Sequence, residues 1–322
     1  MISTPDFRHK QVVFLNTADF SKPQLSFRNE NIVVSGTYGT IDKVPLHRLL
    51  AVFIAGETTL TSKLMEKCMA NGASLFLLKR NLATYASIGA YAEGNYLLRQ
   101  KQYALEEEQS IRIAKKIVEN KLVNHLALLR SVDCDVVRTR TRLAYKKIMK
   151  EKIQKAKDLG ELRGVEGLAS KDFFQAYFSR INWHKRIPRG KIDENNILLD
   201  MGYSFLFNFV DSILRLYGFD TYKGVYHQLF YQRKSLSCDI MEPFRCIVER
   251  ALVKMHTLGQ FDEKDFSVRK GVYGLQYQKN NKYARIFLKE IMNYKMEIHQ
   301  YVRAYYYLVL NNEGEMGKFI IR

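Results

Sequence analysis

The chain has 322 residues, of which 47% are hydrophobic and 12% aromatic, a length and composition that favour two folded lobes and exclude a disordered protein. Its 51 Lys and Arg outnumber its 33 Asp and Glu, and the formal charge of +18 favours a polyanionic partner such as nucleic acid or an anionic membrane surface. Apolar runs such as 49–55 are too short to cross a bilayer and the first residues lack a signal-peptide pattern, so we expect a soluble, cytoplasmic protein.

From residue 11 to about residue 90, short runs rich in β-branched and aromatic residues alternate with turns that contain glycine. Such runs are typical of strands, and they predict strands at 11–15, 31–34, 49–54, 75–78 and 84–88. Between these runs, Leu64, Met65, Cys68 and Met69 recur at helical spacing and predict a short helix over 61–70. Residues 1–93 are therefore predicted to form a small, mostly β N-terminal lobe.

After Gly94 the pattern changes to long stretches with helical periodicity. No Gly or Pro occurs between Gly94 and Gly160, and the apolar periodicity predicts a long helix over 95–131. Further helices are predicted over 171–178, 195–217, 240–256 and 283–310. Residues 94–322 are therefore predicted to form a larger, all-α C-terminal lobe, which makes the chain an α+β protein.

The basic excess is concentrated in the second lobe, since residues 1–93 hold 10 Lys and Arg against 7 Asp and Glu. We therefore expect a polyanion to bind residues 94–322. The candidates for phosphate contacts are Arg163, Lys185, Arg186, Arg189, Lys191, Arg233, Lys234, Arg245 and Arg250. Each of these charges is equally consistent with a solvated helix face.

Phosphodiester chemistry needs a hard cation to neutralise charge on phosphoryl oxygens, and carboxylates with an occasional imidazole suit magnesium or manganese. Glu166 is one candidate ligand, because it follows Gly164 and precedes Gly167 just before a predicted helix. The alternative is an ordinary first-turn glutamate that complements the helix dipole. His227 is a second candidate, although a lone histidine among aromatic residues is also typical of a structural role.

Asp239 and Glu242 form a third candidate, because residues three apart on a helix share one face and could bind one metal ion. The same Asp-x-x-Glu pattern before an apolar run is also a capping box, with Pro243 at the tolerated start of a helix. Both interpretations hold together if Asp239 caps the helix while Glu242 binds the metal.

These segments, in this order and at these separations, resemble those of the CRISPR-associated endonuclease that integrates new spacers, the first of the CRISPR-associated protein families. The resemblance runs through most of the chain. It rests on residues 95–103, Glu166, Gly167, Tyr177, Pro188, Asp193, Asn196, Leu199, Gly202, Tyr203, Gly218, Gly224, His227, 234–236, Asp239, Glu242, Phe244 and Arg245. The chain departs from the family at Glu242, where many members have aspartate, at Cys246, where proline is common, and at Asp200, where asparagine is usual.

The resemblance implies that Mg²⁺ or Mn²⁺ is bound by Glu166, His227 and Glu242, with Asp239 as a nearby acid often needed for activity. It implies a β lobe, residues 1–93, for dimerisation and partner contacts, and a helical lobe, residues 94–322, for catalysis and DNA binding. The implied partners are a second copy of the chain, a short DNA fragment, a CRISPR repeat and a small ferredoxin-like CRISPR-associated protein that bridges two dimers. No membrane partner is implied.

The function expected from this resemblance is integration, in which the 3′-hydroxyl of a short DNA fragment attacks a phosphodiester at the edge of a CRISPR repeat. A first alternative is a stand-alone nuclease that acts on branched or single-stranded DNA with the same metal. A second alternative is a non-catalytic DNA-binding scaffold in which the acidic residues are only helix caps.

Overall fold

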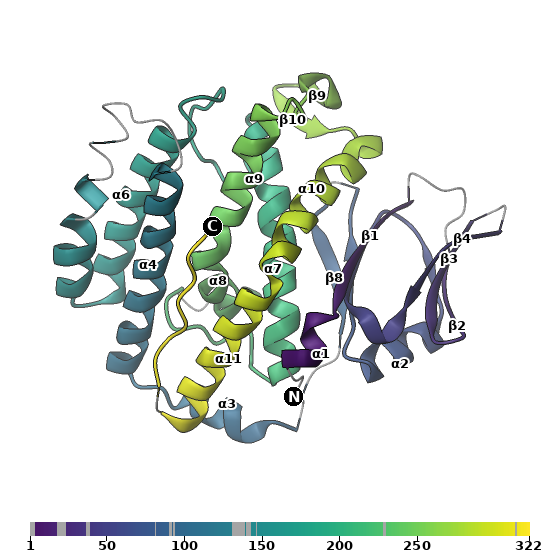
Figure 1. Cartoon of the computed structure of the whole chain (residues 1–322), viewed down its shortest axis with the longest axis horizontal. Coiled ribbons are helices and arrows are strands. Elements are labelled where there is room, and N and C mark those ends of the chain that lie inside the picture. Colours follow the sequence, from purple (N-terminus) through teal and green to yellow (C-terminus); the bar gives the residue numbers. More distant parts are fainter. Residues whose placement is uncertain are drawn as a thin grey trace.

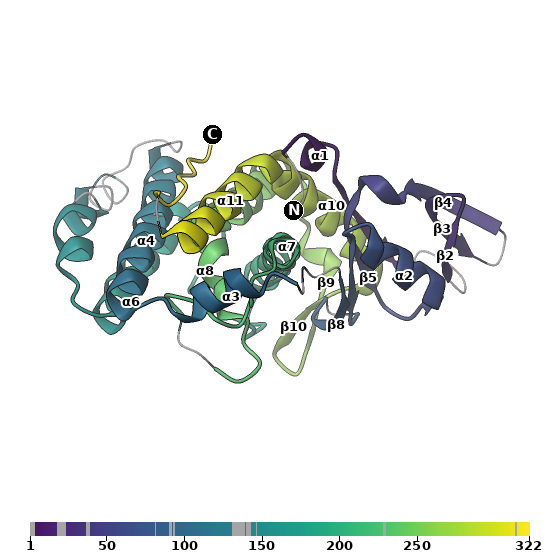
Figure 2. The ribbon, with the colours of Figure 1, turned by 90° about the horizontal axis from the view of Figure 1, so that it is seen from below.

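The computed structural model describes residues 4–17, 24–36, 39–80, 82–89, 92, 94–130, 139, 143–145, 147–227, 230–312 and 314–322. A mostly β N-terminal region, seen at the right of Figure 1, is followed by a helical C-terminal region. The predicted α+β organisation is confirmed. In the second view, the β region again lies beside the helical region (Figure 2).

Within the described residues, the larger N-terminal sheet has the strand order β1-β5-β7-β8, in which β1, β5 and β7 are parallel and β8 is antiparallel. All four strands were predicted, and they are β1 Gln11–Asn16, β5 Leu49–Ala55, β7 Ser74–Leu78 and β8 Thr84–Ile88. Every residue of β5 is buried. Its side chains alternate between two cores, because Phe53 packs with the helical region while Val52 and Ile54 pack toward the second sheet.

The second sheet has the order β4-β3-β2-β6. Its strands are β2 Gln24–Arg28, β3 Asn31–Gly36, β4 Gly39–Pro45 and β6 Thr59–Leu60, of which only β3 was predicted. The turn between β2 and β3 consists of Asn29 and Glu30, which both have positive φ angles of 48° and 58°. Glutamate is rare in such a turn, so no residue pattern predicted a hairpin here. The predicted helix is present as α2 Ser62–Ala70, and two short elements, α1 Thr4–Arg8 and η2 Leu46–Arg48, were not predicted.

The helices of this region follow the predicted order, but three of the predicted long helices are each divided into shorter ones. The helix predicted over 95–131 is divided into α3 Tyr96–Tyr103 and α4 Glu107–Arg130, and residue 131 lies outside the described residues. The helix predicted over 240–256 is divided at Pro243 into α8 Ser235–Met241, the 3₁₀ turn η4 Glu242–Phe244 and α9 Arg245–Thr257. The helix predicted over 283–310 is divided at Tyr294 into α10 Asn280–Asn293 and α11 Lys295–Asn311.

The structure describes further elements in the helical region. They are the π-helical segment η3 Ile148–Ile153, α6 Leu159–Tyr177, α7 Glu194–Tyr217, η5 Glu263–Asp265, β9 Phe266–Arg269, β10 Val272–Leu275 and η6 Tyr277–Lys279. The antiparallel pair β9 and β10 means that this region is not built from helices alone. Its turn, Lys270 and Gly271, has positive φ angles of 51° and 74°, as tight hairpins require.

Helix α7 lies at the centre of the molecule and contacts α8, α9, α10, α11 and β5 (Figure 1). It begins at Asp193, whose side chain accepts a hydrogen bond from Asn196 N, and ends at Gly218 with a φ of 91°. By length and hydropathy α7 could cross a membrane, but 78% of that window is buried inside the protein, as in the core helix of a globular fold. Phe205 on α7 meets Phe53 of β5 with ring centroids 5.2 Å apart, so one core joins the sheet to the helices.

The segment that contains Phe319 and Ile321 lies along α4 and is held there by two buried asparagines (Figure 1). Asn120 donates to Phe319 O at 2.6 Å and accepts from Phe319 N at 3.0 Å. Asn124 accepts from Ile321 N at 2.8 Å and donates to Pro243 O at 3.1 Å. Asn124 therefore ties this segment and the turn η4 to the same helix.

We expect Asn124→Ala to lower the free energy of unfolding by about 2 to 4 kcal/mol, because buried backbone groups lose their hydrogen-bond partner. Urea denaturation followed by circular dichroism measures the change. Asn293→Ala, at an exposed position of α10, is the matched control and should change stability by less than about 0.5 kcal/mol. Equal stabilities of the two variants would contradict the role assigned to Asn124.

Candidate metal centre

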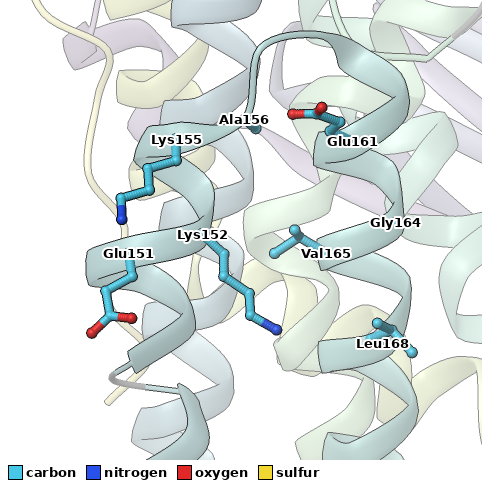
Figure 3. A pocket seen from close by; sticks show the side chains of 8 residues that line it. All are labelled: Glu151, Lys152, Lys155, Ala156, Glu161, Gly164, Val165 and Leu168. Carbon is cyan, nitrogen blue, oxygen red and sulfur yellow. The ribbon is translucent and has the colours of Figure 1, made fainter.

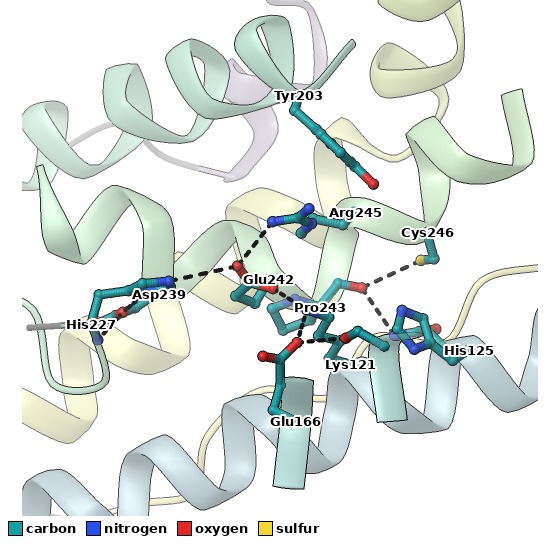
Figure 4. Close-up of polar contacts among 12 residues, drawn as sticks. Lys121, His125, Glu166, Tyr203, His227, Asp239, Glu242, Pro243, Arg245 and Cys246 are labelled. Atoms are coloured by element: carbon teal, nitrogen blue, oxygen red, sulfur yellow. Dashed lines mark hydrogen bonds and ion pairs between the residues drawn. The ribbon is translucent and has the colours of Figure 1, made fainter. Parts of the chain in front are cut away.

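The candidate site lies where α4, α6, η4 and the loop before α8 meet (Figure 4). Glu166 comes from α6, Glu242 begins η4, and His227 lies in the loop that precedes α8. These three residues are far apart in the sequence, and tertiary packing brings their side chains to one place. All three belong to the set predicted to bind a metal.

Glu166 lies within α6 and not just before a helix, so both sequence-based interpretations of its position were wrong. The helix begins earlier, because the side chain of Asp158 accepts a hydrogen bond from Glu161 N at 2.8 Å and caps it. Gly164 and Gly167 have helical backbones, and a Cβ on either would meet no atom within 4 Å. They leave the surface of α6 bare beside Glu166 instead of forming a turn.

Asp239 organises the loop that carries His227. Its buried carboxylate accepts hydrogen bonds from the backbone N–H groups of Val225, Tyr226 and His227 at 2.7, 3.0 and 2.9 Å. It also contacts His227 Nδ1 at 2.6 Å. A Cβ on Gly224 would lie 2.5 Å from Asp239 Oδ2, so only glycine lets the loop approach this closely.

The capping-box interpretation of Asp239 and Glu242 was wrong. Asp239 lies inside α8, and its oxygens bond to loop amides and not to the first turn of a following helix. This arrangement fixes the ring of His227 by its Nδ1 atom and leaves Nε2 directed at Glu242, 3.9 Å from Oε1. Asp239 is therefore a positioning residue, and His227 presents one nitrogen toward the carboxylate of Glu242.

Glu242 is surrounded by positive charge. Its Oε2 lies 2.6 Å from Lys121 Nζ, and its Oε1 lies 3.3 Å from Arg245 Nη1. Burial by itself would raise the pKa of the Glu242 carboxyl, but the charges of Lys121 and Arg245 outweigh this effect and hold the pKa well below its ordinary value. Glu242 is therefore an ionised, buried carboxylate.

Glu166 is ionised for a related reason. Its Oε1 accepts a hydrogen bond from Ser170 Oγ at 2.6 Å and is in contact with the ammonium of Lys121. Burial acts to raise the pKa of Glu166, whereas the Lys121 charge lowers it, and the net result is a lowered pKa. The two glutamates thus share one ammonium group.

The donor set fits a hard divalent cation, because two carboxylates and an imidazole nitrogen are ligands that Mg²⁺ and Mn²⁺ accept. Among the residues that the structure describes, no three His, Cys, Asp or Glu side chains lie close enough together to hold a metal ion. Lys121 lies between the two glutamates instead. The carboxylates are therefore arranged around a positive charge, and a lysine supplies it.

Sequence reasoning missed Lys121, although a signal was present. Ile113, Ile117, Lys121 and His125 are spaced four residues apart, so the lysine and the histidine continue the apolar stripe of α4. Polar residues in register with a buried face predict buried polar contacts. Lys121 is only 6% exposed, and His125 stacks on Phe173 with ring centroids 3.8 Å apart.

Arg245 is fixed by an aromatic ring behind the site. Its guanidinium lies 4.1 Å from the centroid of Tyr203, and the hydroxyl of Tyr203 donates to Glu249 at 2.9 Å. Burial raises the pKa of Glu249. The thiol of Cys246 donates to Pro243 O at 3.3 Å, within the turn that begins at Glu242.

The predicted phosphate-binding residues divide into two groups. Five make contacts inside the protein: Arg163 with Tyr226 O, Arg186 with Asp200, Lys234 with Asp211, Arg245 with Glu242 and Arg250 with Glu290. Lys185, Arg189 and Arg233 are exposed, although Arg233 also donates a hydrogen bond to the thiol of Cys238, and Lys191 is half-buried. These four are better placed to meet a ligand from solvent.

A pocket of about 490 Å³ lies between η3 and α6 (Figure 3). It is lined by Glu151, Lys152, Lys155, Ala156, Glu161, Gly164, Val165 and Leu168. Acidic and basic side chains are mixed there, and none of the predicted metal ligands lines it. The pocket is therefore separate from the candidate metal centre.

Comparison with known proteins agrees with this architecture. A solved casposase bound to its integration product superimposes with a TM-score of 0.80 at 20% identity, covering 95% of this chain and 92% of the other. A chain of a Cas6-RT-Cas1–Cas2 complex gives a TM-score of 0.80 at 23% identity, covering 96% of this chain but 36% of that longer chain. At these identities the two structures establish a shared fold.

The sequence comparisons identify the family. The family model described as CRISPR associated protein Cas1 matches residues 20–291. A CRISPR-associated endonuclease Cas1 of Thermodesulfovibrio yellowstonii is 27% identical over 235 residues, which cover 69% of this chain and 73% of the relative. Because the family match spans most of the chain, this protein belongs to the CRISPR-associated Cas1 family.

Proposed function

We propose that this protein is a metal-dependent DNA integrase and endonuclease that inserts short DNA fragments into a CRISPR array. The observation that carries the proposal is that Glu166 and Glu242 share one cation position, which Lys121 occupies, while His227 Nε2 faces the other oxygen of Glu242 at 3.9 Å. The names of its endonuclease relative and of the casposase bound to an integration product support the same reaction class.

In the proposed reaction, the 3′-hydroxyl of the fragment attacks a phosphodiester of the repeat, and the 3′-oxygen of the repeat strand leaves. Glu166, His227 and Glu242 would hold Mg²⁺ or Mn²⁺, which would supply Lewis-acid polarisation of the phosphoryl oxygen and favour deprotonation of the attacking hydroxyl. Asp239 holds His227 in one orientation, so that Nε2 stays available as a donor atom. Arg245, which lies over Tyr203 and pairs with Glu242, would add a positive charge near the metal ligands. With water as the nucleophile the same groups would hydrolyse DNA.

The wider assembly is also a proposal. We assign catalysis and DNA binding to residues 94–322, and dimerisation and partner contacts to residues 1–93. A small ferredoxin-like CRISPR-associated protein would bridge two dimers. The fold shared with a chain of a Cas6-RT-Cas1–Cas2 complex supports assembly with another CRISPR-associated protein. The exposed Lys185, Arg189 and Arg233 would contact DNA phosphates.

Glu166→Gln and Glu242→Gln should each reduce strand joining by more than about 100-fold, because loss of a metal ligand costs more than loss of a surrounding contact. The assay incubates a labelled short duplex with a supercoiled plasmid that carries the repeat, in manganese, with and without a chelator. Glu108→Gln, on the exposed start of α4, is the matched control and should remain active.

Three outcomes separate the competing functions in this assay. Joined product supports integration, and cleavage without joining supports a stand-alone nuclease. DNA binding with neither reaction, together with no effect of Glu166→Gln, would leave a scaffold and overturn the metal assignment. Circular dichroism of each variant checks that the fold is retained.

Asp239→Asn should lower activity about 10- to 100-fold, because an amide cannot accept all the hydrogen bonds that now fix the loop and the His227 ring. Steady-state joining rates over a manganese titration measure the effect, and a higher manganese requirement is expected. Asp172→Asn, at an exposed position of α6, serves as the control. A wild-type manganese dependence in Asp239→Asn would show that the carboxylate does not position His227.

The triple variant Lys185→Gln, Arg189→Gln and Arg233→Gln should weaken DNA binding for every sequence tested. The slope of log K against log salt should decrease by about 0.9 for each lost phosphate contact. Arg28→Gln, Lys63→Gln and Lys79→Gln together remove the same charge from exposed positions of the N-terminal region. If both triple variants lose the same affinity, DNA binding depends on net charge and not on the helical region.

A further inference from the structure

Lys121 has an unusual position for a lysine. Its ammonium contacts Glu166 Oε1 and lies 2.6 Å from Glu242 Oε2, while its side chain is 7% exposed (Figure 4). The three residues come from α4, α6 and η4, so the contact joins three separate elements. The ammonium therefore balances two buried carboxylates at the centre of the site.

An ammonium and a divalent cation compete for this position. A metal ion that binds both glutamates needs carboxylate oxygens at roughly 2.0 to 2.2 Å. Glu166 Oε1 and Glu242 Oε2 are the atoms that Lys121 engages. Two positive groups cannot both lie between the same oxygens, because their repulsion in a buried site is strong.

We propose that Lys121 is an internal counter-ion that occupies the cation position of the metal-free protein and leaves at least one carboxylate when the divalent cation binds. This inference rests on the metal ligands assigned under the proposed function. The lysine stem has four rotatable carbons and can move its ammonium without moving α4. Metal binding is thus an exchange of one cation for another.

The exchange has two consequences that a purely structural lysine would not have. Without metal, Lys121 stabilises the fold, because its removal leaves two buried negative charges without the partner they share. With metal, Lys121 lowers the apparent affinity, because its contacts with the glutamates must break first. Removal of the ammonium should therefore lower the stability of the metal-free protein and increase its affinity for the metal ion.

The test compares the wild-type protein with Lys121→Met, which keeps most of the apolar stem and removes the charge. Isothermal titration with Mn²⁺ should give a Kd at least about tenfold lower for the variant, because contacts between charged groups no longer have to break. Thermal denaturation in chelator should give a lower Tm for the variant, and saturating Mn²⁺ should raise its Tm more than that of the wild type. Lys116→Met, at an exposed position of α4, is the control.

An unchanged or weaker Mn²⁺ affinity in Lys121→Met would overturn the proposal. If that variant does not fold without metal, Lys121→Gln replaces it, since its amide still donates to a carboxylate but carries no charge, and the same two measurements apply. Glu166→Gln and Glu242→Gln are titrated in parallel. If they bind Mn²⁺ as the wild type does, the ligand assignment itself fails, whereas loss of binding there with unchanged affinity in the lysine variant refutes the counter-ion alone.

Discussion

The candidate site depends on one buried charge contact, in which the ammonium of Lys121 is shared by Glu166 and Glu242. Two negative charges that contact the same ammonium group in a buried site repel each other strongly. The two carboxylates can therefore be ionised together only beside a cation. The contact joins α4, α6 and η4 through their side chains. The same requirement for positive charge makes the site suitable for a divalent metal ion.

A second constraint acts on the imidazole. The carboxylate of Asp239 collects three backbone N–H groups and His227 Nδ1, and the missing side chain of Gly224 permits this close approach. A loop without regular secondary structure thereby holds its histidine in one orientation. The orientation of His227 depends on hydrogen bonds to a buried acid more than on helix rigidity.

The support for both constraints extends to distant parts of the chain. Asn124 bonds to Pro243 O, next to Glu242, and to the segment around Phe319, so packing at α4 fixes the turn η4 from behind. Gly202 lets α7 approach α9 and α10 closely, since a Cβ there would lie 2.5 Å from Val248 and 2.8 Å from Phe287. The packing of α7 against α9 and α10 thus holds the ring of Tyr203 against the guanidinium of Arg245.

The sequence by itself determined the elements whose burial pattern is local, such as β5 and α7, and the resemblance picked out Glu166, His227 and Glu242 as candidate ligands. Only the tertiary structure decided that Asp239 positions the loop and that Lys121 lies between the glutamates. It also decided that Arg186, Lys234 and Arg250 make internal ion pairs while Lys185 is exposed. The reason is physical: periodicity reports which face of an element is buried, whereas the partner of a buried charge comes from a residue far along the chain.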